Sequence, residues 1–153
     1  MRSKRECLVS IGVWLLAVMG LLALDISPGL AQQGKAENEE RIHAVISKVP
    51  GKDRNRSNPL ESDPDAVAAG GKLFEQHCAE CHGKKAEGTN RAPSLLGRGV
   101  QEASPGALFW VVTNGVVRRG MPVWSKLPEP ERWQIVTFLK SWQAGQNEKE
   151  RGR

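Results

Sequence analysis

The pattern of apolar and polar positions divides the chain into four stretches. Residues 7–24 are almost continuously apolar, whereas residues 32–62 are polar apart from one short apolar patch at residues 42–49. Between residues 63 and 145, apolar side chains recur at the three- and four-residue spacing of one helix face. We therefore predict an all-α domain of three to four helices at residues 63–145, followed by a disordered charged tail at residues 146–153.

The first predicted helix begins at Asp63. Asp63 suits the N-cap and Pro64 suits the first helical position. One face then carries Val67, Gly70 or Gly71, Phe74 and Cys78. A glycine inside a helix costs about 1 kcal/mol relative to alanine, so we expect it to serve a close helix crossing, at Gly71. His77 lies off this face and is expected to point outward.

Two more helices follow after a glycine-punctuated loop. Ser104 and Pro105 predict a helix start, and Gly115 predicts its end. Residues 120–124 are predicted to form a turn. The last helix is predicted from Pro128 through Trp142, with positions 135, 138, 139 and 142 on one face, which we expect to cross the Gly71 helix near Phe138.

Residues 1–31 have the pattern of a secretory signal. A basic start at residues 1–6 precedes the apolar run, and the small residues Gly29–Ala31 fit a cleavage site. The alternative is an uncleaved membrane anchor formed by residues 7–24. Either interpretation places the remainder outside the cytoplasm, in the periplasm or an equivalent exported compartment. Residues 32–62 bury too little to fold alone, so we interpret them as a tether or as an arm lying on the domain.

Charge and composition narrow the class of protein. The 153 residues carry a formal charge of +5, which falls to +4 without residues 1–31. The cations are dispersed among acidic residues, so nucleic-acid binding is not expected, although acidic protein partners suit the balance. Of three cysteines, only Cys78 and Cys81 lie beyond the signal, too few for a disulfide scaffold.

The segment from Cys78 to His82 carries the candidate chemistry. Cys78 and Cys81 stand three residues apart and His82 follows directly, which is the pattern of covalent haem attachment. Each thiol can add to one haem vinyl group, and His82 then lies under the iron as an axial ligand. A redox dithiol would need a strand-then-helix context, and a structural zinc site would need two further Cys or His ligands.

Met121 is the candidate second ligand. It is the only methionine beyond the signal segment, and it stands between Gly120 and Pro122 rather than inside a regular element. A methionine more commonly fills a core, but this loop context favours iron ligation. We expect Arg118 and Arg119 either to guide an acidic partner or to be ordinary solvated charges.

These residues resemble the class I cytochromes c. The resemblance rests on Phe74, the Cys78–His82 motif, Pro93, Met121 and the aromatic C-terminal helix, and it covers about residues 63–143. It implies a small cytochrome c fold wrapped around one haem c, bound through Cys78 and Cys81. It also implies that the Pro93 carbonyl accepts a hydrogen bond from His82. Without any tyrosine in the chain, Trp124, Arg91 and Arg98 become the candidates to bind a propionate.

The resemblance implies an electron carrier, not an enzyme. We expect a monomer that carries single electrons between redox proteins. The expected donor is a quinoprotein dehydrogenase, and the expected acceptor is a terminal oxidase or another cytochrome. The alternative function is a haem-based gas sensor or small peroxidase, in which Met121 is weak or displaced.

Overall fold

The computed structural model describes the backbone of residues 28–151 and the side chains of residues 33–142. Residues 7–24, the apolar run of the predicted signal and its anchor alternative, lie outside this range, whereas residues 28–31 of the predicted signal are helical. The chain divides into two compact units, residues 1–35 and residues 36–153. The helices, in chain order, are α2 (Pro28–Ile46), α3 (Gly51–Arg54), α4 (Pro64–His77), α5 (Ala79–His82), α6 (Arg98–Gln101), α7 (Pro105–Asn114), the 3-10 helix η1 (Val117–Arg119) and α8 (Glu129–Arg151).

The all-α prediction is confirmed for the described residues, which contain no strand and only one isolated bridge, between Val116 and Met121. The helix starts are also as expected. The Asp63 carboxylate accepts hydrogen bonds from the main-chain N–H groups of Asp65 and Ala66, and the Ser104 hydroxyl accepts one from Ala107. Among residues 28–151, no helix combines the length and the apolar character that a membrane span needs.

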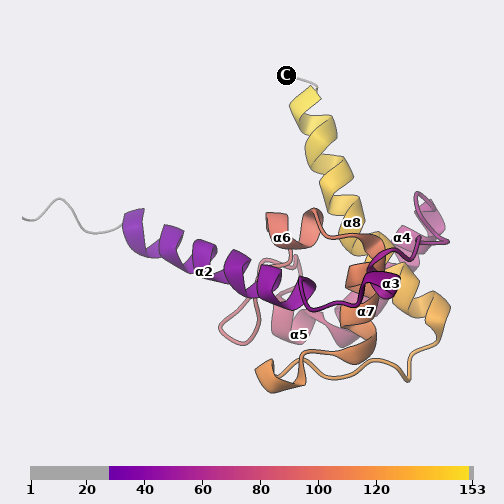
Figure 1. Cartoon of the computed structure of the whole chain (residues 1–153). Helices are drawn as coiled ribbons and strands as arrows, with labels where there is room; N and C mark the ends of the chain where they lie inside the picture. Colours follow the sequence, from indigo (N-terminus) through magenta and orange to yellow (C-terminus); the bar gives the residue numbers. More distant parts are fainter. Residues whose placement is uncertain (1–27, 152–153) are drawn as a thin grey trace, which may run out of the picture. The chain divides into compact units, whose positions relative to one another are not determined.

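Helix α8 packs along α4 and also contacts α7 and α6 (Figure 1). The close crossing of α4 and α8 is real, but its centre is Gly70 rather than Gly71. A Cβ at Gly70 would overlap the main-chain carbonyl of Gln134, whereas one at Gly71 would meet only the Phe138 ring, at 3.3 Å. Both glycines lie near the face of α4 that packs against α8. The path of the α8 backbone decides which glycine lies closer to it.

Two apolar clusters form the core of unit 36–153. The Phe74 cluster is made of Phe74, Ala86, Val112, Ile135 and Leu139, with half-buried neighbours that include Leu73, Cys78, Leu95, Trp124 and Leu127. The Phe109 cluster is made of Ile42, Val100, Ala103, Leu108, Phe109, Trp133 and Val136, with Ile46, Leu60 and Leu95 packed against it. Leu95 belongs to the surroundings of both clusters.

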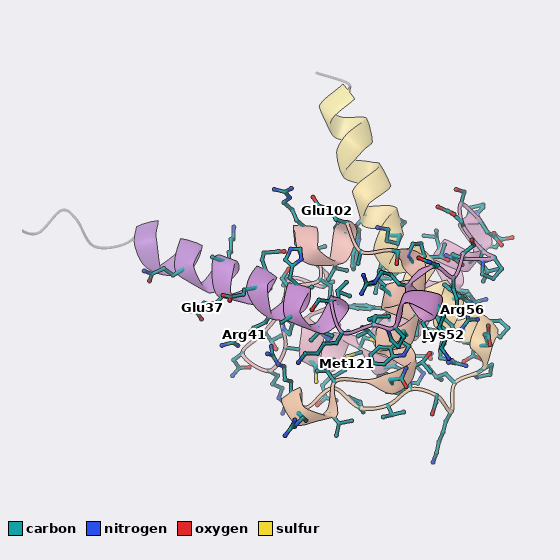
Figure 2. The ribbon with its side chains drawn as sticks, in the orientation of Figure 1. Glu37, Arg41, Lys52, Arg56, Glu102 and Met121 are labelled. Atoms are coloured by element: carbon teal, nitrogen blue, oxygen red, sulfur yellow. The ribbon has the colours of Figure 1, made fainter. Side chains whose placement is uncertain are left out.

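Residues 36–62 pack on the helices that follow them. Ile42 and Val49 are buried, and Asn58 donates a buried hydrogen bond to the Thr137 hydroxyl (2.9 Å). The Arg56 guanidinium lies 4.5 Å over the Phe109 ring and pairs with Glu129; Arg56 is labelled in Figure 2. Of the two interpretations of this stretch, these contacts favour the arm.

Helix α8 continues past Gly145 to Arg151, in place of the predicted disordered tail. Its last residues are mostly Gln, Glu, Lys and Arg, which have high helix propensity. One glycine costs only about 1 kcal/mol, which is too little to end a helix in such a sequence.

Candidate haem-attachment site

The two thiols and the imidazole lie on one short turn. Cys78 ends α4, and the four-residue helix α5 carries Cys81 and His82. The main-chain N–H of His82 bonds the Cys78 carbonyl at 2.9 Å, which holds the motif in a single helical turn. Both cysteines are free and half-buried. The turn keeps the two sulfurs close in space, as attachment to a single ring requires.

The His82 ring is oriented by a main-chain carbonyl. Its Nδ1 lies 2.8 Å from the Pro93 oxygen. A carbonyl oxygen only accepts, so Nδ1 carries the hydrogen and Nε2 keeps its lone pair. Burial lowers the pKa of His82 by more than the Pro93 contact raises it, which favours the neutral ring. The contact implied by the family resemblance is therefore present, and it leaves Nε2 available to bind iron.

The loop between His82 and Pro93 is tied at several points that sequence reasoning missed. The Thr89 hydroxyl donates to the Cys81 carbonyl at 2.5 Å, and the Thr89 N–H donates to Ala92 at 2.9 Å. Gly88, at φ +86°, donates its N–H to the His82 carbonyl. A glycine followed by threonine in a tight loop was the available signal. These bonds fix Pro93 relative to His82.

The segment after Met121 contacts the end of α4. The Trp124 ring lies 5.1 Å from the His77 ring, centroid to centroid, and Trp124 and Leu127 pack against the same cluster as Cys78. His77 is thus half-buried against Trp124, so the expectation that it points outward was wrong. Its position off the core face of α4 is what turns it toward the loop. The fold brings the motif and the methionine loop to one apolar cluster.

Met121 lies in a closed loop (Figure 2). The main-chain groups of Val116 and Met121 bond each other in both directions, at 3.1 and 3.3 Å, and η1 lies between them. Gly120 is left-handed, at φ +86°, and Met121 is half-buried. The loop closure restrains the backbone from which the thioether extends.

The candidate propionate ligands have other partners. Arg91 pairs with Glu80 at 2.7 Å and Arg98 pairs with Glu102 at 2.9 Å, and all four side chains are exposed. The Glu80 carboxylate raises the pKa of Arg91. Both arginines form surface ion pairs, and Arg91 does so with a residue of the motif itself, whereas Trp124 contacts His77 just before the motif.

The competing interpretations of the two cysteines fit the structure less well. Burial, followed by the nearby Cys81, raises the pKa of the Cys78 thiol to about 11, whereas a redox dithiol needs a thiol of lowered pKa. Among the described side chains, no three of His, Cys, Asp and Glu gather closely enough to hold a metal ion. A haem would fit this site better, because both thiols lie on one turn, Nε2 of His82 keeps its lone pair, and Cys78 packs against apolar side chains.

Comparison with known proteins agrees with this chemistry. Residues 65–139 match the family described as cytochrome c oxidase, cbb3-type, subunit III. The chain contains a c-type cytochrome domain. A domain of this kind implies covalent haem and electron transfer, and Cys78, Cys81 and His82 have the expected attachment spacing.

One solved structure extends the likeness of the cytochrome domain. Cytochrome cL from the marine methylotrophic bacterium Methylophaga aminisulfidivorans MPT is 28% identical, with a TM-score of 0.50. The alignment covers 56% of this chain and 58% of that one, so less than two thirds of the matched structure is represented. No curated protein sequence matches the chain. Residues 36–62 lie outside the family match.

Gly88→Ala should destabilise the haem-loaded protein, because the new Cβ would approach the Ser94 nitrogen to 2.5 Å in a backbone conformation that already disfavours a side chain. Gly120→Ala is the matched control, because Gly120 has the same φ of +86° but a Cβ there would have no atom within 4 Å. Urea unfolding should show Gly88→Ala less stable than the control by about 1–3 kcal/mol. Equal stabilities would show that the loop yields without disturbing Pro93.

Proposed function

We propose that this cytochrome domain is an exported, monohaem carrier of single electrons, with His82 and Met121 as the axial ligands of the iron. The observation that carries the proposal is the hydrogen bond from His82 Nδ1 to the Pro93 oxygen. It fixes the ring's tautomer and orientation and makes Nε2 more basic. An oriented Nε2 with a free lone pair suits iron ligation.

The chain would hold the haem through three neighbouring residues and one distant one. Cys78 and Cys81 would provide the two thioether links, and His82 would be the proximal ligand. When bound, the haem supplies one-electron cycling between the ferric and ferrous states. Met121 would be the second ligand of the iron through its thioether, and Trp124, whose ring contacts His77, would help to bind the haem.

Two protein ligands favour electron transfer over catalysis. An iron with an open position binds or activates small molecules, whereas an iron with two protein ligands is closed to them. The Val116–Met121 bridge, the left-handed Gly120 and Pro122 restrain the methionine backbone, so the ligand would stay in place in both oxidation states. A soft thioether stabilises the ferrous form and raises the potential.

The loop that carries Met121 also offers a docking surface. Val117 and Val123 are the two large apolar side chains that stand out as exposed in the described part of the chain, at 66% and 49%. Between Glu102 and Glu129 the chain has three cations, Arg118, Arg119 and Lys126, and no acidic residue. An apolar centre with a positive rim suits a partner with an acidic surface. We call Val117, Arg118, Arg119 and Val123 the η1 surface.

The family match and the N-terminal sequence support the proposed redox partners and the proposed export of the protein. The family description names an oxidase subunit, which supports a terminal oxidase as the proposed acceptor. The proposed donor is a quinoprotein dehydrogenase, and a further cytochrome is the other proposed acceptor. Residues 1–31 have the pattern of an export signal, and export is compatible with covalent haem attachment. We further propose residues 63–145 as the limits of the haem-binding domain.

Replacement of Met121 by Ala should abolish the sulfur-to-iron charge-transfer band in the visible spectrum of the oxidised protein. The same variant should bind carbon monoxide readily when reduced, because one side of the iron is then open. Val123→Ala, at an exposed position two residues away, is the control and should keep the band. A persistent band in the Met121 variant would refute the ligand assignment.

The unmodified protein distinguishes the carrier from its alternative. Reduced wild-type protein at neutral pH should bind carbon monoxide poorly. Ready binding would identify Met121 as weak or displaced and would support the gas sensor or small peroxidase.

Charge reversal on the η1 surface should slow electron exchange with acidic partners. Arg118→Glu with Arg119→Glu is compared with Lys48→Glu with Lys52→Glu, a pair of exposed cations on the arm. Voltammetry at a carboxylate-terminated monolayer should show a rate at least about tenfold lower for the first variant at low salt, and little change for the second. Equal rates for both variants would place the docking surface elsewhere.

A further inference from the structure

We infer that the arm, through the C-terminal half of α2, helps to position the proximal ligand. Glu39 and Ile42 hold the segment after Pro93, so that the Pro93 carbonyl keeps its hydrogen bond with His82. The inference rests on the proposed function and assigns a role to residues outside the family-matched region. Figure 1 shows the C-terminal half of α2 beside α6, and the side chains of Glu39 and Ile42 make the contacts between them.

The first contact is polar. The Glu39 carboxylate accepts a hydrogen bond from the Gly99 N–H at 2.6 Å. Gly97, the N-cap residue of α6, has no side chain with which to cap the helix, so Glu39 supplies an acceptor from elsewhere in the chain. A bond to an ionised carboxylate is roughly twice as strong as a neutral one.

The sequence leaves room for this contact. A Cβ at Gly97 would overlap the Glu39 carboxylate, and a Cβ at Gly99 would come within 2.8 Å of the Ile42 side chain. A side chain at Gly97 would displace the Glu39 carboxylate, and one at Gly99 would press on the Ile42 side chain close to its backbone. The two glycines are therefore explained by the arm, and loop flexibility is not needed to account for them, since neither has a positive φ.

The second contact is apolar. Ile42 is only 8% exposed and lies in the Phe109 cluster with Val100, which belongs to α6. Leu95 packs against this cluster and also against the Phe74 cluster, which includes Cys78 among its neighbours. Leu95 thus connects the arm with the haem-attachment turn.

The other end of the same segment holds His82. Pro93 accepts from His82 Nδ1, and Asn38 of α2 donates to the carbonyl of the next residue, Ser94, at 3.5 Å. Only five residues separate Pro93 from Gly99. Between these ends the Leu95 N–H also donates to the Ala86 carbonyl at 2.8 Å. Release at Gly99 should therefore loosen the Pro93 carbonyl through Leu95, which packs against both clusters. A weaker bond to Nδ1–H makes the ligand less basic and favours the ferrous state.

Glu39→Ala in the haem-loaded chain tests the arm. We expect the Nδ1–H of His82 to exchange with solvent roughly tenfold faster in NMR spectra of the reduced protein, the change that loss of one charge-assisted hydrogen bond would give. The reduction potential should rise. Glu39→Gln keeps the side chain's shape and an acceptor oxygen without the charge, so its exchange rate should fall between those of the wild type and Glu39→Ala. Glu40→Ala, at an exposed neighbour on the same helix, should leave both properties unchanged.

Different results would refute the positioning role of Glu39 and the proposed electron-carrier function. An unchanged exchange rate and potential in Glu39→Ala would overturn the arm, even if the variant were less stable. Should Glu39→Ala fail to fold, Glu39→Gln decides: faster exchange than in the wild type would support the arm, and wild-type exchange would overturn it. Wild-type protein without an iron-bound His82 signal would overturn the proposed function itself.

Discussion

The hydrogen bond between the His82 ring and the Pro93 carbonyl is the interaction on which the rest of the site depends. It selects the tautomer that leaves Nε2 free, and it fixes the plane of the ring. The intervening loop is built to preserve it, through the Thr89 hydroxyl on Cys81 and the positive φ of Gly88. The segment beyond Pro93 is held in turn by α6 and by Glu39.

The helix crossing explains why the distant parts of the site meet. The missing side chain at Gly70 lets α4 reach the backbone of α8, and the Phe74 cluster closes around that contact. The end of α4 then delivers the two thiols, while Trp124 brings the segment after Met121 against His77. Close backbone packing therefore brings Cys78 and Trp124, which lie far apart in the sequence, against one cluster.

Local chemistry made part of this structure predictable, and tertiary contacts decided the rest. Asp63 and Ser104 act as caps within three residues of themselves, so the sequence was enough to place both helix starts. The register of Gly70 and the burial of His77 depend on residues of α8 and of the methionine loop, which no local pattern reveals. The arm was ambiguous because a mostly polar stretch hides two buried anchors, Ile42 and Val49. Spacing identified the haem motif, but not Thr89 or Glu39, whose partners are main-chain groups.

Covalent haem attachment can be measured as the intact mass, under denaturing conditions, of protein purified from a host that attaches haem to c-type cytochromes. The chain should be heavier than its processed sequence by one haem, and a Cys78→Ser, Cys81→Ser double variant should lack this addition. A mass equal to that of the unmodified chain would show that the site holds no covalent haem and would refute the proposed electron carrier.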